Sequence, residues 1–212
     1  KISGAAMDAG ETLLNLLYFW YDVKTCRMTT RDRLKSTHIL TCWKDIWFAK
    51  GEQQTKMDQT LEGYRASIDQ LVDYKPENTL EKIGMIILYD QLTRNIFRGT
   101  PRAYEYDHIA FSLAKSIVDS GEYETLELQY KLTVLMSFIH SEDLEIQKRL
   151  ESTLLPALRN TINIDPNLLA AINKIAMNHR ERVLLFGRIP ERTRIRGGQL
   201  TNEEVNYLEN VY

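Results

Sequence analysis

Cysteine and long apolar runs are both scarce in this chain of 212 residues. Cys26 and Cys42 are its only cysteines, which is typical of a reduced intracellular protein and argues against a disulfide scaffold. The longest apolar stretches, 13–20 and 83–89, are far shorter than the roughly 18 to 20 residues that span a bilayer. We therefore expect a soluble, cytoplasmic protein without a membrane partner; a targeting peptide already removed from the chain is compatible with this.

Flexible linkers and an excess of one charge are also lacking. With ten glycines and five prolines, no segment is rich enough in either to mark a domain boundary. A single domain over 8–212 is expected, and residues 1–7, with the run Ser3-Gly4-Ala5-Ala6, resemble an artificial linker outside the fold. The net charge of -2 and the pI of about 6.1 provide no global field that would hold a nucleic acid.

What the chain does have is helical periodicity. Apolar residues recur at spacings of three and four, and no stretch alternates long enough to indicate a sheet. The pattern predicts an all-α protein, a compact antiparallel array of roughly seven or eight helices. The expected helical segments are 8–24, 39–47, 57–72, 77–97, 103–120, 124–139, 141–156, 165–187 and 201–208. Their predicted caps are Asp8 with Glu11, Ser141, Asp165 before Pro166, and Thr201 with Glu204.

A first polar cluster, DQLTRNIFRGTPRA at 90–103, directly follows the most hydrophobic predicted helix. Asp90 and Arg94 lie four residues apart with the acid first, the favourable order for an ion pair. Gln91, Arg94 and Arg98 share a helix face, where the arginines could fork onto a carboxylate or phosphate. A structural role, in which Asp90 and Arg94 tie helix ends together, is an equal alternative.

A second cluster, FIHSEDLEIQ at 138–147, carries His140, Glu142 and Asp143, residue types that transfer protons or bind metals. Their spacing matches no helical metal pair, and His179 is remote in sequence, so we expect no metal and no cofactor. His140 as a general acid or base, with Glu142 as a further catalytic candidate, is an alternative to a structural histidine. No nucleophile accompanies them.

The third cluster spans 179–201 and is rich in arginine. Phe186 is its only aromatic residue, so the stacking platform of a single-strand binder is missing, and nucleic acid is not an expected partner. Alternatively, these arginines pair with Asp90, Glu142 and Asp143 in a charged network that stabilises the fold. The six arginines are Arg180, Arg182, Arg188, Arg192, Arg194 and Arg196.

Together these motifs resemble a family known as domain of unknown function 924, over nearly the whole chain from Leu16 to Thr201. The most specific parts are the DQ, RN and RGTPRA elements, Asp107, the HSED element, and His179 leading into FGRIPERT. The resemblance implies a compact, tetratricopeptide-like all-α fold in which the polar motifs meet near one cleft. The matching positions are Asp90, Gln91, Arg94, Asn95, Arg98, Asp107, His140, Ser141, Glu142, His179, Gly187, Arg188, Pro190 and Arg192.

The chain departs from the family pattern in its tail. Glu191 stands where the family commonly has histidine, Thr193 where it has asparagine, and Gly198 where it has arginine. The stretch 26–41 is an additional divergent segment. If the tail contributes to a site, its ligand in this chain is expected to differ or to be lost.

Three functional hypotheses follow, and the sequence leaves open whether the protein is an enzyme. The favoured one is an arginine-rich cleft that binds an anionic small molecule or an acidic protein segment. The second is an enzyme that uses His140 oriented by Glu142 or Asp143. The third is a scaffold whose charges only stabilise the fold. The ligand-binding candidates are Asp90, Gln91, Arg94, Asn95, Arg98, Asp107, Ser141, His179, Arg188 and Arg192. A single site requires Asp90, His140 and Arg188 to be neighbours.

Overall fold

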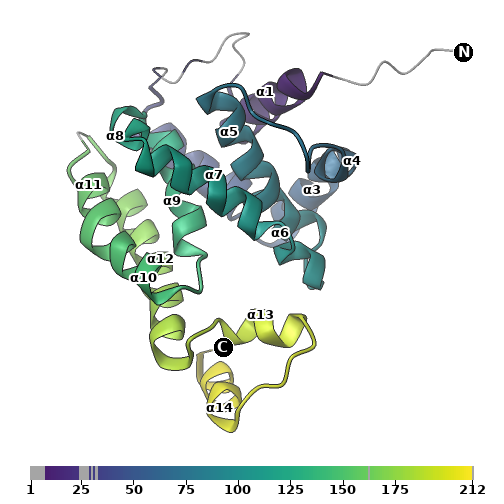
Figure 1. Cartoon of the computed structure of the whole chain (residues 1–212), viewed down its shortest axis with the longest axis vertical. Helices are drawn as coiled ribbons and strands as arrows, with labels where there is room; N and C mark the ends of the chain where they lie inside the picture. The colour runs from purple at the N-terminus through teal and green to yellow at the C-terminus, as the bar shows by residue number, and fades with distance from the viewer. Residues whose placement is uncertain (1–7, 24–28, 30, 32, 162, 212) are drawn as a thin grey trace, which may run out of the picture.

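The computed structural model describes residues 8–23, 29, 31, 33–161 and 163–211, with only the backbone at 211. Within these residues the chain is helical and contains no strand, which confirms the all-α prediction. Consecutive segments merge into eleven helices, nine of them with at least seven residues, close to the number expected. Figure 1 shows them packed as a layered array.

The N-terminal elements are, in chain order, α1 (Ala9–Trp20), α2 (Ser36–Cys42), a π-helical turn (Trp43–Trp47), α3 (Gly51–Leu61), a 3-10 turn (Glu62–Tyr64) and α4 (Arg65–Gln70). The helix expected from 57 therefore begins six residues earlier, at Gly51. Residues 51–56 contain no apolar side chain and are mostly exposed, so no apolar periodicity placed them in a helix. The prediction that the Asp8 side chain caps the first helix was also wrong, because this side chain makes no capping hydrogen bond.

The central elements are α5 (Thr79–Ile86), a π-helical turn (Ile87–Leu92), α6 (Thr93–Ile96), a 3-10 turn (Pro101–Tyr104), α7 (Asp107–Asp119), α8 (Glu122–Thr125) and α9 (Leu128–Ile139). The α5 helix packs against α1, α7 and α9 and lies at the centre of the array. A Cβ added to Gly84 would lie 3.0 Å from the Cβ of Leu13, so a glycine at this position allows α1 and α5 to approach closely.

The C-terminal elements are α10 (Leu144–Arg149), a π-helical turn (Leu150–Leu154), α11 (Leu155–Arg159), α12 (Pro166–Phe186), α13 (Pro190–Ile195) and α14 (Asn202–Val211). Helix α13 was not expected, because its arginines mask the short helical pattern. The prediction that Ser141 caps α10 was wrong: Asp143 accepts the backbone N–H groups of Glu145 and Ile146 at 2.8 and 3.3 Å.

Two other caps at the C-terminal end are confirmed. The Asp165 carboxylate accepts the backbone N–H of Asn167 at 2.8 Å, with Pro166 in the first turn of α12. Thr201 and Glu204 form the expected capping box, each side chain accepting the other's backbone N–H, at 3.2 and 2.7 Å. These caps fix the ends of the long α12 helix and of α14, and α13 between them packs on the 3-10 turn at Pro101–Tyr104.

The N-terminal end of the core is held by aromatic side chains. Trp20 and Trp47 stack with ring centroids 5.8 Å apart, and Trp47 Nε1 donates to the Trp20 carbonyl at 2.8 Å. Tyr21 is fully buried and shares a 2.6 Å hydrogen bond with Thr133 of α9. The opposite end is different, because there the helices α6, α7, α9 and α12 meet the segment α13, drawn in yellow in Figure 1.

Candidate functional site

The centre of the candidate site is a buried pair formed by Asp90 and His140. His140 Nδ1 lies 2.8 Å from Oδ1 and 2.9 Å from Oδ2 of Asp90. Asp90 is 1% exposed and follows the apolar turns of α5, whereas His140 directly follows the last turn of α9. Gln91 Nε2 also donates to the Asp90 carboxylate. Residues fifty positions apart in the chain thus form the first of the expected contacts.

The two members of this pair have opposing electrostatic surroundings. Burial alone raises the pKa of the Asp90 carboxyl, but His140, Arg94 and the hydrogen bonds outweigh it and hold this pKa well below its usual range. Burial and the neighbouring Arg94 charge lower the pKa of His140, against the opposing effect of Asp90. The consistent state at neutral pH is an ionised Asp90 that accepts a hydrogen bond from the Nδ1–H of a neutral imidazole.

Arg94 links this pair to α7. Its guanidinium donates to both oxygens of Asp107, each at 2.9 Å, and its Nη1 also donates to the Asp90 backbone carbonyl. The closest carboxylate oxygen of Asp90 lies 3.5 Å from Arg94 Nη1. Bidentate pairing of this kind fixes the orientation of a guanidinium and uses most of its donors. Arg94 is therefore a largely structural cation, although it also lines the His179 cavity.

Arg192 enters the site from α13. Its Nη1 donates to the His140 carbonyl oxygen at 2.7 Å and lies 3.6 Å from Glu142 Oε1 and 3.8 Å from Asp107 Oδ2. The residue is 5% exposed, and burial together with Arg94 lowers the pKa of its guanidinium. Within the part of the chain that the structure describes, no hydrogen bond leaves its Nε or Nη2 atom.

Two further side chains surround His140. The Tyr104 ring lies beneath three guanidinium carbons, those of Arg94, Arg192 and Arg196, at 5.4, 5.3 and 5.5 Å from its centroid. The His179 ring of α12 lies 5.3 Å from the His140 ring, and its Nδ1 contacts the Ile175 carbonyl at 3.0 Å. Burial and His140 lower the pKa of His179 far below its usual range, so both histidines are neutral at pH 7.

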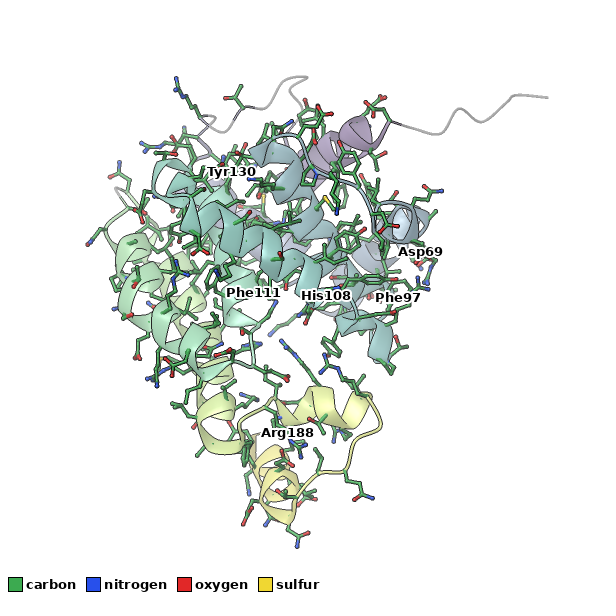
Figure 2. The ribbon with its side chains drawn as sticks, viewed as in Figure 1. Asp69, Phe97, His108, Phe111, Tyr130 and Arg188 are labelled. Carbon is green, nitrogen blue, oxygen red and sulfur yellow. The ribbon has the colours of Figure 1, made fainter. Side chains whose placement is uncertain are left out.

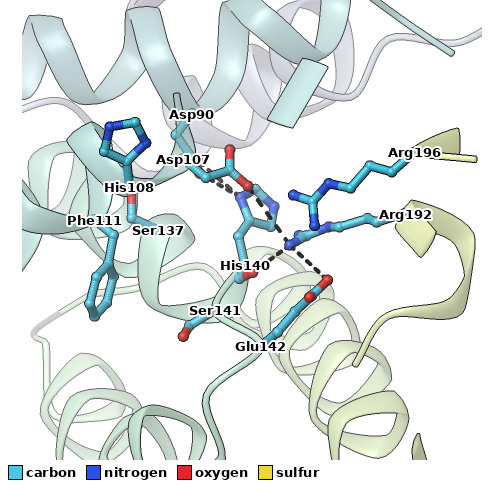
Figure 3. Close-up of a pocket in the computed structure, with 10 residues that line it drawn as sticks. All are labelled: Asp90, Asp107, His108, Phe111, Ser137, His140, Ser141, Glu142, Arg192 and Arg196. Carbon is cyan, nitrogen blue, oxygen red and sulfur yellow. Dashed lines mark hydrogen bonds and ion pairs between the residues drawn. The ribbon is translucent and has the colours of Figure 1, made fainter. Parts of the chain in front are cut away.

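Two cavities open on either side of His140 and Arg192. The first, here the Ser137 cavity, has a volume of about 210 Å³. The second, here the His179 cavity, has a volume of about 540 Å³. Figure 3 shows Arg192 of α13 pointing toward His140 and Glu142, with Arg196, which directly follows α13, beside it. The residues that line the Ser137 cavity are Asp90, Asp107, His108, Phe111, Ser137, His140, Ser141, Glu142, Arg192 and Arg196.

The predicted site residues divide into two groups. The members of the first group surround His140 or line the two cavities: Asp90, Gln91, Arg94, Asp107, Ser141, Glu142, His179 and Arg192. Arg98 belongs to the second group, because it lines the His179 cavity but is paired with a carboxylate. Arg98 Nη2 and Asn95 Nδ2 both donate to Asp58 Oδ1, each at 3.0 Å. Asp143 is occupied as the cap of α10. It therefore does not orient His140, a role that the structure gives to Asp90.

Arg188 does not join His140. Its Nε and Nη2 donate to the two oxygens of Glu204 at 2.7 Å each, on the capping box of α14. Figure 2 shows Arg188 within the C-terminal segment, apart from His108 and Phe111 beside the Ser137 cavity. The expected neighbourhood of three residues is therefore realised for Asp90 and His140 only, and the cation that approaches them from the tail is Arg192.

The divergent tail residues also find places in the structure. Glu191 lines the His179 cavity and accepts a hydrogen bond from Arg182 Nε at 2.8 Å. Thr193 and Gly198 contact each other, since a Cβ at Gly198 would lie 2.8 Å from Thr193 Cγ2. The departures at 193 and 198 thus concern one contact between α13 and the residues that follow it. The earlier divergent stretch, 26–41, is described only in part, and Cys26 lies outside the described residues.

The lining residues that sequence reasoning missed include Tyr104, His108, Phe111, Ser137 and Arg196. Arg196 was recognised only as one of six clustered arginines. Ser137 precedes His140 by one helical turn, a spacing that could have placed both on one face of α9. The Ser137 hydroxyl is buried and has no hydrogen-bond partner among the described residues.

The described residues contain neither a metal-binding cluster nor a membrane-spanning helix. Among residues 8–23, 29, 31, 33–161 and 163–211, no group of three histidine, cysteine, aspartate or glutamate side chains could hold a metal ion. The same residues include no helix with the length and apolarity needed to cross a membrane.

Comparison with known proteins agrees with the fold. A solved structure of a protein of unknown function from Agrobacterium tumefaciens superposes with a TM-score of 0.67 at 24% identity, over 96% of this chain and 99% of that one. At this identity the likeness concerns the fold alone. No curated protein matches the sequence. The model of the family described as "Bacterial protein of unknown function (DUF924)" matches residues 16–211, and the chain belongs to that family.

Proposed function

We propose that the protein binds a small anionic molecule, a carboxylate or a phosphate ester, in the cleft formed by the Ser137 and His179 cavities. Arg192 is the observation that carries this proposal. It is a buried cation that lies between both cavities, and only Nη1 of its three nitrogens donates a hydrogen bond to a described residue. A guanidinium carries five N–H donors, and those on Nε and Nη2 of Arg192 are open to the cavities instead of being sealed inside the protein. A bound oxyanion would satisfy them.

The distribution of ion pairs supports the same assignment. Most arginines near the cleft are already paired with carboxylates: Arg94 with Asp107, Arg98 with Asp58, Arg182 with Glu191 and Arg188 with Glu204. Arg196 is exposed, lines the Ser137 cavity and has no carboxylate partner among the described side chains. Arg192 makes only longer carboxylate contacts, at 3.6 Å to Glu142 and 3.8 Å to Asp107, so a ligand would compete with these two groups for its charge deep in the cleft. Arg196, at the rim, has no such competitor in the described part of the chain.

Cavity size favours a small molecule over the acidic protein segment that the sequence also suggested. Volumes of about 210 and 540 Å³ suit a compact metabolite. Tyr104 beneath three guanidinium groups holds them in position by cation–π contact. The ligand would thus meet arginines that are already oriented, which lowers the entropic cost of binding.

Native mass spectrometry of the freshly purified protein can reveal a co-purified anion directly. Thermal unfolding with succinate and with glycerol phosphate as added probes measures binding, because a ligand at 100 times its Kd stabilises the folded state by about 2.7 kcal/mol. We expect Arg192→Ala to weaken probe binding by roughly 10- to 100-fold, the range for loss of hydrogen bonds to a charged group. Arg196→Ala is expected to weaken it less, because its guanidinium is solvated.

Arg33→Ala is the matched control, since Arg33 forms an exposed pair with Glu127 and lines neither cavity. It should leave probe affinity unchanged. If Arg192→Ala and Arg33→Ala bind both probes as well as the original protein does, the cleft is not the anion site. Stabilisation by an acidic peptide but by neither small probe would transfer the role to a protein partner.

A further inference from the structure

The two ring nitrogens of His140 have different surroundings. Nδ1 contacts both carboxylate oxygens of Asp90, at 2.8 and 2.9 Å. Nε2 makes no hydrogen bond to any residue that the structure describes, although the ring lines both cavities. A histidine whose function is structural ordinarily has both nitrogens bonded to the protein or to solvent. Here one nitrogen is held by a buried carboxylate, and the other is available to a molecule in the cleft.

The surrounding charges fix the protonation state of this imidazole. Asp90, ionised and buried, requires the proton on Nδ1, so the lone pair is on Nε2. The charged and titratable groups that act on the ring or contact it are Asp90 and Arg94 from the run 79–96, His179 from α12 and Arg192 from α13. Asp107, His108, Glu142 and Arg196 line the Ser137 cavity with it. Burial and Arg94 lower the pKa of His140, which keeps Nε2 unprotonated at neutral pH. This is the state that a general base requires.

We propose that His140 is the general base of a hydrolase, with Asp90 as its positioning residue, and that the substrate is a small ester carrying a carboxylate or phosphate group. This proposal rests on the anion site at Arg192 and Arg196, which would hold the charged end of the ester. The ester carbonyl would then lie beside His140, and the remaining alkyl part would contact Phe111 in the Ser137 cavity.

The reaction needs only water as second reactant. Nε2 of His140 takes a proton from water while the water oxygen bonds to the carbonyl carbon, and the carbonyl π pair moves to oxygen. The resulting oxyanion accepts N–H donors of Arg192. When the oxyanion re-forms the carbonyl, the bond to the leaving oxygen breaks, and the leaving oxygen takes the proton from Nε2. A carboxylic acid and an alcohol are released, and His140 returns to its neutral form.

Chromogenic esters can test this chemistry. The probes are 4-nitrophenyl hydrogen succinate, which carries a carboxylate, and neutral 4-nitrophenyl acetate. We expect the intact protein to hydrolyse the succinate ester with the higher kcat/KM. His140→Gln should lower kcat by about 100-fold or more, the usual contribution of a general base. Since the backbone carbonyl that contacts Arg192 remains, its affinity for free succinate should change by less than about threefold.

His38→Gln is the matched control for this substitution. His38 contacts the Tyr21 carbonyl through Nε2 at 2.8 Å and lines neither cavity, so kcat should stay within about twofold. An equal loss of rate in both variants overturns the proposal, because the effect would then not be specific to His140. No loss in either variant overturns it as well, because hydrolysis would then not use His140. Retained succinate binding by His140→Gln shows that the variant is folded.

Asp90→Asn tests the positioning role. Removal of the carboxylate takes away a charge that favours the protonated imidazole, so the acid limb of the pH–rate profile should move to lower pH while kcat falls. A variant that is merely destabilised would lose active protein without moving that limb. If succinate binds but neither ester is hydrolysed above the rate of His140→Gln, His140 is not a general base and the anion site still stands. If succinate does not bind, both proposals fail.

Discussion

The two ends of the described fold are stabilised in opposite ways. At one end Trp20, Tyr21 and Trp47 pack with stacked and edge-on rings, the Tyr21 hydroxyl bonds to Thr133, and Trp47 Nε1 donates to a backbone carbonyl. At the other end a carboxylate, a histidine and two arginines share a small buried space around His140. The first arrangement lowers the free energy of the folded state directly by removing apolar surface from water. The second has to offset the desolvation of its charges.

This difference teaches where function is to be sought. Buried charged groups contribute little net stability even when they are well paired, whereas removal of one partner is very costly. A region that gathers them beside two cavities is thus poorly explained by stability alone. Among the described side chains, the aromatic end has no buried charges whose desolvation must be offset. Substitutions there should therefore affect stability without affecting ligand binding.

Trp20→Ala should produce the largest loss of stability. Trp20 is 2% exposed and stacks on Trp47, so truncation leaves a large cavity and should lower the free energy of unfolding by about 3 to 5 kcal/mol. Urea unfolding followed by far-UV circular dichroism measures this change. Trp20→Phe, which keeps part of the stack, should cost distinctly less. A loss below about 1 kcal/mol for Trp20→Ala would mean that the aromatic end is not the main source of stability.

Arg94→Ala should cause the next largest loss of stability, because it leaves Asp107 and Asp90 without their common cation. We expect a loss of about 3 kcal/mol, the lower end of the range for breaking a buried ion pair. Arg196→Ala, which removes an exposed side chain without a carboxylate partner, should change stability by less than about 0.5 kcal/mol. The same unfolding experiment compares the two. Equal losses would contradict the division into structural and ligand-binding arginines.

Acidification should have a smaller effect, confined to the charged end. Because the folded chain lowers the pKa of both His140 and His179, the unfolded chain binds more protons once the pH falls below the ordinary value of about 6.5. The free energy of unfolding should therefore decrease between pH 7 and pH 5. Denaturant midpoints at several pH values measure the slope, and His140→Gln combined with His179→Gln should flatten it. A stability that rises on acidification would exclude neutral buried histidines.

Local features were the most accurately predicted from the sequence. The Asp165 cap before Pro166 and the capping box of Thr201 and Glu204 involve residues within three positions of each other, so a short pattern contains all the information. The all-α class followed for the same reason. By contrast, the cap of α10 was assigned to Ser141 because Ser141 and Asp143, two positions apart, are both good capping residues, and the pattern does not rank them.

Partner assignments across long separations were less accurate. His140 was expected to be oriented by Glu142 or Asp143, its neighbours in sequence, but its partner Asp90 comes from another helix. Arg188 was assigned to the cleft from its position in an arginine-rich segment. Helix α13 turns that segment so that Arg192 faces His140 and Arg188 faces Glu204. Periodicity predicts which face of a helix is apolar, but not which cation reaches a given carboxylate.

The π-helical turn at Ile87–Leu92 sets the direction in which the residues after it face. A π turn accommodates one residue more than an α turn. The wider turn absorbs that additional residue, so the residues after it face as they would in a uniform α-helix one residue shorter. If the same residues were wound as a continuous α-helix, everything after Leu92 would turn by about 100° about the helix axis, the angle of one residue. Arg94 would then point away from Asp107, and Phe97 would leave the interior. The orientation of Arg94 toward α7 and the burial of the end of this helix therefore depend on the same turn.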